Sequence, residues 1–181
     1  MKPTFRQLPM LVVNGKAQVV QSGAIMRYLA SRFNMLPEDL LQRGQVDALF
    51  EGAQELFFPL NPTVNFAVGD DFLAKQATLR ESLQPRMADF ERVLVASGGP
   101  FLSGSVPFYC DFGLFHHIDL THFIDAKLLT YYPALSEFMD AMRGISGVAR
   151  YLAGRPELID VGFAPKLIID GTPRPTGAAN N

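Results

Sequence analysis

The sequence predicts a mainly helical α+β protein in which a short strand-strand-helix unit precedes an all-helical domain. Asn14-Gly15 separates the apolar run 10–13 from a second β-rich run that ends at Val20. An Asn-Gly pair between two such runs is the strongest short-range signal for a β-hairpin. Over most of the remaining sequence apolar residues recur at steps of three and four, which is the period of an amphipathic helix.

The composition is that of a globular protein and argues against nucleic acid as a partner. Hydrophobic residues make up 48% of the 181 residues and charged residues 19%, which is too apolar for a disordered chain. The net charge is −2, and no run of five like charges occurs. No electrostatic feature therefore favours a phosphate backbone.

Cysteine content and the first residues bear on location. Cys110 is the only cysteine, which excludes an intrachain disulfide and fits a reducing compartment. The apolar run 8–13 is interrupted by Pro9 and is too short for a signal peptide or a membrane span. We therefore expect a cytoplasmic protein with no membrane partner.

The strand-strand-helix unit is expected to end with a helix from Ser22 to Phe33. Ser22 is a good N-cap, and the apolar residues after it share one helical face. An isolated hairpin is marginal in water and needs further strands or a packed helix. The unit therefore looks incomplete, and we expect earlier strands that this numbering does not contain.

Helical patterns fill most of the chain after Pro37, which suits a first helical turn. The first long helix is expected to end at Asn61-Pro62. Pro85 is expected either to kink the second long helix, at 71–96, or to restart it. After Pro156 regularity fades, and residues 171–181 have the Gly, Pro and Asn content of a loose tail. Further helices are expected at 71–96, 111–126, 133–143 and 146–153.

Three short motifs, in order, carry a resemblance to a known family. They are Gln7-Leu8-Pro9 at a strand start, the Asn14-Gly15 hairpin, and Gln21-Ser22-Gly23-Ala24-Ile25 at a helix start. Together they resemble the second half of the thioredoxin-like domain of cytosolic glutathione transferases, most closely the sigma, mu and pi classes. The resemblance continues to about residue 157, through segments similar to the fourth, sixth and terminal helices of the family.

The resemblance implies a domain organisation. Residues 1–33 would form a partial thioredoxin-like, glutathione-binding domain, 34–165 an all-helical C-terminal domain and 166–181 a tail. The family's first strand, first helix and second strand have no counterpart before Met1, and its catalytic Tyr or Ser lies there. We therefore assign no catalytic residue. Phe108 is a further departure, because the sixth helix of the family opens with Ser or Thr.

The resemblance also implies a glutathione site in two short segments. Gln7 matches a glutathione contact, and Leu8 would present its backbone to the cysteinyl unit if the bond to Pro9 is cis. The alternative is an ordinary trans bond at a strand edge. Gln21 and Ser22 match the residues that hold the γ-glutamyl carboxylate at a helix N-terminus, and the alternative for both is simple capping.

Four further positions are assigned by the same resemblance. Glu51 matches an acid that reaches across the dimer interface toward the γ-glutamyl ammonium, although a single Glu on a long helix is usually only solvated. Phe57, Phe58 and Phe66 fall where the acceptor-substrate pocket is expected. Aromatic residues at helical spacing are more often core than ligand contacts.

Two charged residues are expected to be structural, and no metal site is expected. Arg27 has no assigned contact with glutathione, and Asp111 should accept backbone N–H bonds where its helix begins. The histidines His116, His117 and His122 with Cys110 invite a zinc interpretation. Cys110 and His117 would lie about 10 Å apart at a rise of about 1.5 Å per residue, too far for shared ligation.

The expected function is conjugation of glutathione, as substrate, to small electrophilic apolar molecules by a homodimer. The nucleophile is the thiolate, and an unperturbed cysteine thiol has a pKa of about 8.5, so the site must favour the anion. The alternative is a non-catalytic binding or interaction module, because the catalytic segment has no counterpart. For the same reason we expect these 181 residues to bind glutathione weakly.

Overall fold

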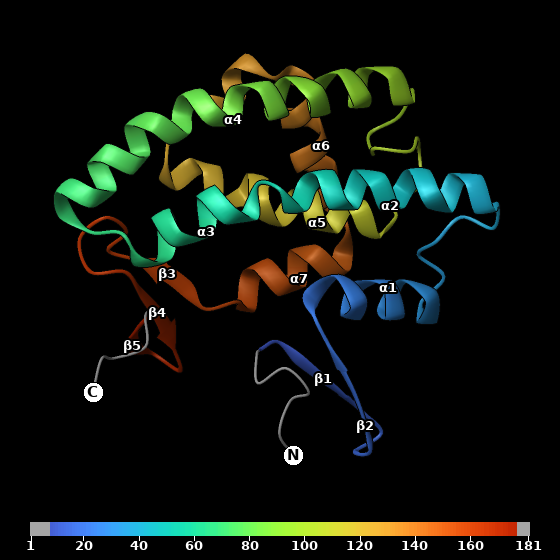
Figure 1. The fold of residues 1–181 in the computed structure, drawn as a ribbon, viewed down its shortest axis with the longest axis horizontal. Coiled ribbons are helices and arrows are strands. Elements are labelled where there is room, and N and C mark those ends of the chain that lie inside the picture. The colour runs from blue at the N-terminus through green and yellow to red at the C-terminus, as the bar shows by residue number, and fades with distance from the viewer. Residues whose placement is uncertain (1–7, 177–181) are drawn as a thin grey trace.

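Seven α-helices and five short strands make up residues 8–176, the part of the chain that the computed structural model describes (Figure 1). The predicted mainly helical α+β fold is confirmed. Two 3₁₀ turns, Thr121–Phe123 and Leu128–Tyr131, connect α5 to α6. The helices are α1 (Ser22–Arg32), α2 (Leu40–Gln54), α3 (Phe57–Phe66), α4 (Gly69–Ser97), α5 (Tyr109–Leu120), α6 (Pro133–Gly144) and α7 (Ser146–Gly154). The strands are β1 (Met10–Val13), β2 (Ala17–Val20), β3 (Glu157–Ile159), β4 (Lys166–Ile169) and β5 (Thr172–Pro175).

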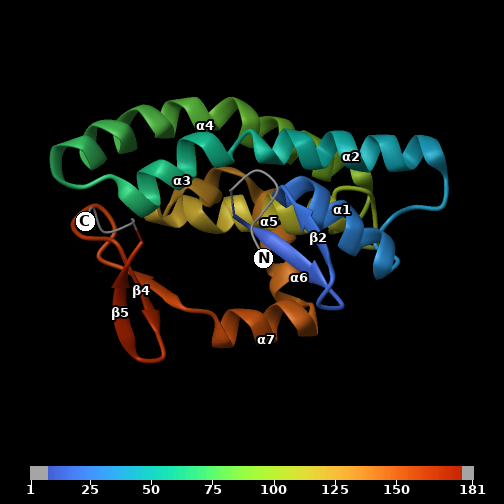
Figure 2. The same ribbon diagram turned by 60° about the horizontal axis from the view of Figure 1, so that its bottom comes forward.

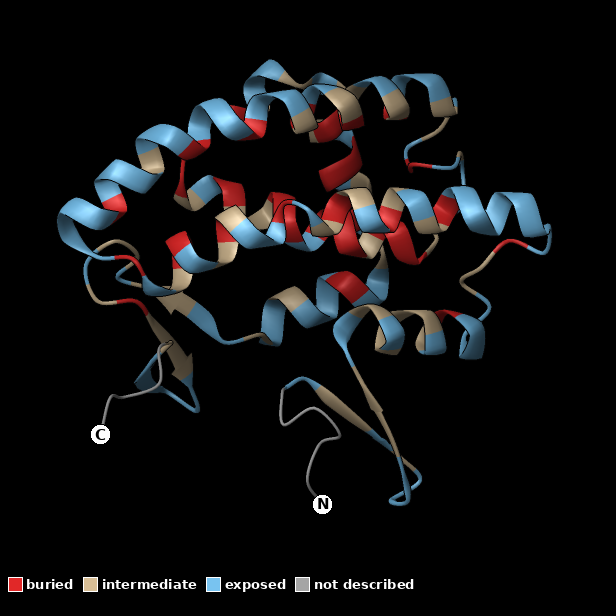
Figure 3. Ribbon diagram, viewed as in Figure 1, coloured by how far each residue is buried: buried red, intermediate tan, exposed pale blue. Residues whose placement is uncertain are grey.

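Helix α5 is the most completely buried helix of the body. Tyr109, Cys110, Leu114 and Ile118 are almost fully buried, because the helix is apolar on nearly all sides. It packs against α1, α2, α3 and α6. Figure 3 shows buried residues where α2 and α3 lie over α5. The helices that carry the candidate site residues are thus fixed to one common core.

The first long helix is broken earlier than the sequence predicts. Helix α2 ends at Gln54 and α3 begins at Phe57, whereas a single helix ending at Asn61-Pro62 was expected. Pro59 has no N–H and could not donate to the Glu55 carbonyl of a continuous helix. The break therefore falls at residues 55–56, and Pro59 lies in the first turn of α3, where no donor is needed.

Helices α4 and α5 differ from their predicted bounds for separate reasons. Helix α4 contains Pro85 and runs without interruption from Gly69 to Ser97, so the proline does not restart it. Helix α5 ends at Leu120 rather than at residue 126, because the Thr121 hydroxyl donates to the Ile118 carbonyl at 2.6 Å and the chain tightens into a 3₁₀ turn.

Within residues 8–176, none of the helices combines the length and apolar composition that crossing a bilayer requires.

Part of the chain after Pro156, for which the sequence predicts fading regularity and a loose tail, forms a small antiparallel sheet. Residues 177–181 of the predicted tail lie outside the described residues. Strands β3, β4 and β5 pair in that order, and we call them the C-terminal sheet. Ile169 pairs with Thr172, so the two-residue turn between β4 and β5 is Asp170-Gly171, and both residues have positive φ. Asp-Gly is a hairpin signal like Asn-Gly, and the loose-tail prediction overlooked it. A domain boundary between residues 165 and 166 would divide this sheet.

The C-terminal sheet is attached to the loop between α3 and α4 (Figure 2). Gly69 donates its N–H to the Gly162 carbonyl at 2.8 Å, and Val68 forms a parallel bridge with Gly162. The Thr176 hydroxyl also donates to the Asn65 carbonyl. These contacts hold the sheet against the end of the helical body.

Gly162→Ala is expected to detach the C-terminal sheet more than Gly171→Ala does. Both glycines have φ near the left-handed region, 80° and 71°, so both variants carry a backbone cost of about 1 kcal/mol. A Cβ at Gly162 would also lie 2.6 Å from the Phe72 ring, whereas one at Gly171 meets nothing within 4 Å. Limited proteolysis should cut the Gly162 variant faster after residue 155. Equal cleavage of the two variants would contradict this attachment.

Close packing of α2 on α5 leads to a second paired prediction. A Cβ at Gly113 would lie 2.9 Å from the buried Phe50 ring, whereas one at Gly52 would lie 3.7 Å from Phe90, an ordinary contact. We expect Gly113→Ala to lower the free energy of unfolding by about 1 to 3 kcal/mol. Gly52→Ala should raise it by about 0.5 to 1 kcal/mol through helix propensity. Urea unfolding followed by circular dichroism measures both, and the same sign for both would refute the packing account.

Candidate functional site

The β1–β2 hairpin brings the two segments predicted to bind glutathione to one end of a sheet. The strands are antiparallel, and Met10 lies opposite Val20. The residues just before Met10 and just after Val20 therefore lie at the same end of the hairpin. Segments 8–9 and 21–22 are thus neighbours, at the point where β2 leads into α1.

The first of these segments carries a cis peptide bond. The bond between Leu8 and Pro9 is cis, which is the geometry that the Leu8-Pro9 motif predicts. Leu8 is 82% exposed, so a ligand can reach it. Gln7, the other residue predicted in this motif, lies outside the described residues.

The second segment forms an uncapped helix N-terminus. Helix α1 begins at Ser22, so Gln21 rather than Ser22 is the residue before the helix, and no side chain caps it. Gln21 has φ 73°, a left-handed value that is uncommon for a residue with a Cβ. Both residues are exposed. The first-turn N–H groups and the positive end of the helix dipole therefore favour an anion here.

An ion-pair cluster joins α1 to α2 and α5. Arg27 Nε donates to Asp47 Oδ1 at 2.7 Å, and its guanidinium also donates to Glu51. The Tyr109 hydroxyl donates to the same Asp47 oxygen. Arg27 therefore links α1 to α2. Glu51 pairs with an arginine of its own chain while its side chain stays 58% exposed, and its contact with a second subunit remains a prediction.

The cluster fixes the protonation states of its members. The hydrogen bond to Asp47 raises the pKa of Arg27. Burial acts to raise the pKa of Asp47, but the hydrogen bonds from Arg27 and Tyr109 outweigh it and lower that pKa. Burial, followed by the hydrogen bond to Asp47, raises the pKa of Tyr109. Tyr109 is therefore a committed donor to Asp47 and is not available to donate to a glutathione sulfur.

Asp111 lies in the first turn of α5. Its Oδ1 accepts from the Leu102 N–H and its Oδ2 from the Phe108 N–H, both at 2.8 Å. Phe108 supplies no side-chain acceptor in return, so half of a capping box is present. Burial, and then the Asp111 carboxylate, raises the pKa of Cys110, so this thiol stays protonated and unreactive.

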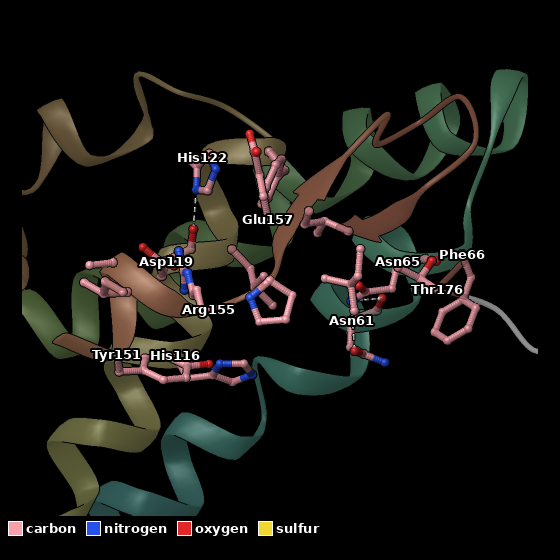
Figure 4. Close-up of a pocket in the computed structure, with 17 residues that line it drawn as sticks. Asn61, Asn65, Phe66, His116, Asp119, His122, Tyr151, Arg155, Glu157 and Thr176 are labelled. Atoms are coloured by element: carbon pink, nitrogen blue, oxygen red, sulfur yellow. Dashed lines mark hydrogen bonds and ion pairs between the residues drawn. The ribbon is translucent and has the colours of Figure 1, made fainter. Parts of the chain in front are cut away.

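A cavity of about 890 Å³ lies between α3, α5, α7 and the C-terminal sheet (Figure 4). Of the three phenylalanines predicted to line an acceptor pocket, Phe66 lines this cavity, and Phe57 and Phe58 do not. Phe57 instead contacts Phe58 and the buried His117, with ring centroids 5.8 and 6.0 Å apart. Phe57 and Phe66 lie at opposite ends of α3 and, at 3.6 residues per turn, on opposite faces of it.

The three histidine rings lie against other rings. His122 packs on Phe123, with ring centroids 3.8 Å apart, and His116 lies 5.1 Å from His117 by the same measure. Between residues 8 and 176, no group of three His, Cys, Asp or Glu side chains is placed to hold an ion.

Known proteins share both the sequence and the fold of this chain. The family model described as glutathione S-transferase, C-terminal domain, matches residues 61–155, more than half of the chain. The chain belongs to the glutathione S-transferase family. Glutathione S-transferase 2 of Onchocerca volvulus is 29% identical over 153 residues, covering 83% of this chain and 72% of the relative. Glutathione S-transferase A1 of Bos taurus is 30% identical over 154 residues, covering 82% and 66%.

Solved glutathione S-transferase structures agree with this fold. The Onchocerca volvulus pi-class enzyme matches with a TM-score of 0.74 and 28% identity, over 83% of this chain and 71% of that one. The structure of NaGST-2 matches with a TM-score of 0.76 and 22% identity, over 85% of this chain and 76% of that one. At this identity the match supports the fold alone. The thioredoxin-like unit and helical domain implied by the sequence are therefore those of the family.

Sequence reasoning missed most of the cavity in this glutathione S-transferase chain. Asn61 and Asn65 line it from α3, His116 from α5, and Tyr151 and Arg155 from the C-terminal part of the chain. A signal was present, because two asparagines spaced by four interrupt an otherwise apolar helix and lie on one face. Arg155 could not be placed, since its position depends on how α7 packs.

Proposed function

We propose that this protein binds glutathione at the end of β1 and α1 and conjugates its thiolate to small electrophiles held in the cavity. The observation that supports this most is the uncapped N-terminus of α1, with exposed Gln21 and Ser22 beside the backbone of Leu8. We choose glutathione as the ligand because the chain belongs to the glutathione S-transferase family. Cytoplasmic location and a homodimer, in which Glu51 would approach the partner's glutathione, belong to the same proposal.

The proposed binding mode places each part of glutathione against a group that suits its charge or its hydrogen bonds. The γ-glutamyl carboxylate would bind at the helix N-terminus, and the cysteinyl backbone would pair with Leu8 as an added strand. The thiol loses its proton to solvent, and the sulfur electron pair then forms a bond to the electrophilic carbon while the leaving group departs.

Glutathione binding tests the proposal directly. Titration of ¹⁵N-labelled protein with glutathione should shift the amide signals of residues 21–24. The dissociation constant should be no tighter than about 1 mM, a binding free energy near −4 kcal/mol. Ser22→Ala should weaken these shifts, because a charge-assisted hydrogen bond contributes about 1.5 to 3 kcal/mol. Ser146→Ala is the matched control, since Ser146 is also the first residue of a helix, α7. No shift at residues 21–24, or equal loss in both variants, would contradict the site.

The second candidate function is a non-catalytic binding or interaction module. The β1–β2 sheet has two strands among residues 8–176, and so small a sheet holds Leu8 less rigidly than a larger one. Conjugation of a chloronitrobenzene by the 181-residue protein separates the candidates. A rate above the uncatalysed reaction supports the enzyme, and the uncatalysed rate together with normal folding supports the module.

A further inference from the structure

The cavity has the dimensions of a ligand site and is partly walled by the C-terminal sheet. Its volume of about 890 Å³ falls in the range of small-molecule sites, about 300 to 1,000 Å³. Leu158, Leu167 and Thr176 line it, and all three lie beyond residue 155, where the family match ends. The contacts of Gly162 with Gly69 and of Thr176 with Asn65 hold this wall in place.

Charge inside the cavity is already compensated. Arg155 Nη2 lies 2.7 Å from Asp119 Oδ2, and Arg143 approaches the other oxygen of Asp119 at 3.7 Å. Burial lowers the pKa of His116, so its imidazole is neutral near pH 7. Glu157 is an exposed carboxylate among the lining residues. An anionic ligand would therefore meet no unpaired arginine and would have to approach Glu157.

Aromatic rings and asparagine amides are the other groups in the cavity that a ligand could contact. Phe66, Phe123 and Tyr151 line the cavity from α3, the 3₁₀ turn after α5, and α7, and aromatic side chains favour stacked or edge contacts with planar ligands. Asn65 Nδ2 donates to Asn61 Oδ1 at 3.1 Å. Asn61 thus accepts through its side-chain oxygen, and among residues 8–176 its NH₂ group donates to no partner, so its donor capacity is unused.

We infer that the cavity selects uncharged, flat aromatic molecules that carry hydrogen-bonding groups, rather than purely apolar or charged ones. Purely apolar ligands would bury the asparagine amides without partners, which costs free energy. The inference names the acceptor class of the proposed function and rests on it. It departs from the apolar acceptors that the sequence predicts.

A matched ligand series tests the inference without glutathione. The probes are naphthalene molecules with a 2-carboxamide, 2-carboxylate, 2-carboxamidine or 2-methyl group, which share a flat two-ring body and differ in charge and polarity. Binding is followed by NMR through the ring protons of His116 and His122. The carboxamide should bind at least about tenfold more tightly than each of the other three.

Two variants locate the effect. Asn61→Leu removes the amide but keeps the number and branching of side-chain heavy atoms, and it should reduce the preference for carboxamide over methyl to less than about threefold. Gln84→Leu makes the same kind of change on the exposed face of α4, outside the cavity, and should leave the preference intact. Thermal melting checks that both variants fold.

The outcomes are distinct. Tighter binding of the methyl or a charged probe, absence of shifts at both histidines, or an unchanged preference in Asn61→Leu would each overturn the inference. Glutathione binding is measured separately at the amides of residues 21–24. Loss of that signal with carboxamide selectivity retained would refute the proposed glutathione site and leave the cavity assignment standing.

Discussion

Asp111→Ala is expected to lower the free energy of unfolding by about 3 to 5 kcal/mol, the largest effect of any single substitution considered. Asp111 is fully buried and accepts two backbone N–H bonds at 2.8 Å. Each bond to a charged group contributes about 1.5 to 3 kcal/mol, and its loss leaves a buried donor without a partner. Typical domains are stable by about 5 to 15 kcal/mol, so the variant should unfold at much lower urea concentration.

Two further variants separate this role from a general effect of removing an aspartate. Asp111→Asn keeps one acceptor oxygen and should lose about half as much stability as the alanine variant. Asp140→Ala removes an aspartate whose side chain is 76% exposed, and its effect should stay below about 1 kcal/mol. A loss below about 1 kcal/mol for Asp111→Ala would show that water replaces the carboxylate at no cost.

Acid is expected to destabilise the protein through His117. Burial, with a smaller contribution from the neighbouring His116, lowers the pKa of His117 from 6.5 to about 4. Below pH 6.5, His117 binds a proton in the unfolded chain but not in the folded one. The free energy of unfolding is therefore unaffected by His117 above that pH and decreases as the pH drops toward 4. At 1.36 kcal/mol per pKa unit, the loss amounts to about 3 kcal/mol.

His117→Leu isolates this contribution. Among the described residues neither ring nitrogen of His117 has a hydrogen-bond partner, so an apolar side chain should be tolerated at neutral pH. The stability advantage of the variant over the original protein should grow by about 2 to 3 kcal/mol between about pH 7.5 and about pH 4.5. Met139→Leu, a change at another buried position, should show no such growth. An advantage that is the same at both pH values would refute the role assigned to His117.

Local signals in the sequence were enough to predict most elements of this fold. Asn14-Gly15 predicts the β1–β2 hairpin because the dipeptide suits positive φ at both positions, and both residues have it. The helices at 133–143 and 146–153 are also close to α6 and α7. The prediction places the end of the first long helix too late, because Pro59, three residues before Pro62, already prevents a continuous helix.

The candidate site was only partly predictable, because it combines local motifs with packing. Leu8, Gln21 and Ser22 meet through a hairpin whose register the motif itself sets. The cavity depends on the distance between α3 and α7, which no short motif encodes. Asp119 illustrates this, since its partner Arg155 lies on a different helix end, and nothing in the spacing of the two residues identifies them as a pair.

Strand β5 has a consequence for the behaviour of the protein in solution. Its pairing with β4 begins at Ile169–Thr172, next to a two-residue turn, so Pro173 and Pro175 fall at positions whose N–H would point away from β4. Proline has no N–H, and the outer edge of β5 therefore offers carbonyl acceptors without the alternating donors that another strand requires. This edge resists strand addition, so β5 can lie exposed at the edge of the C-terminal sheet without promoting aggregation between molecules.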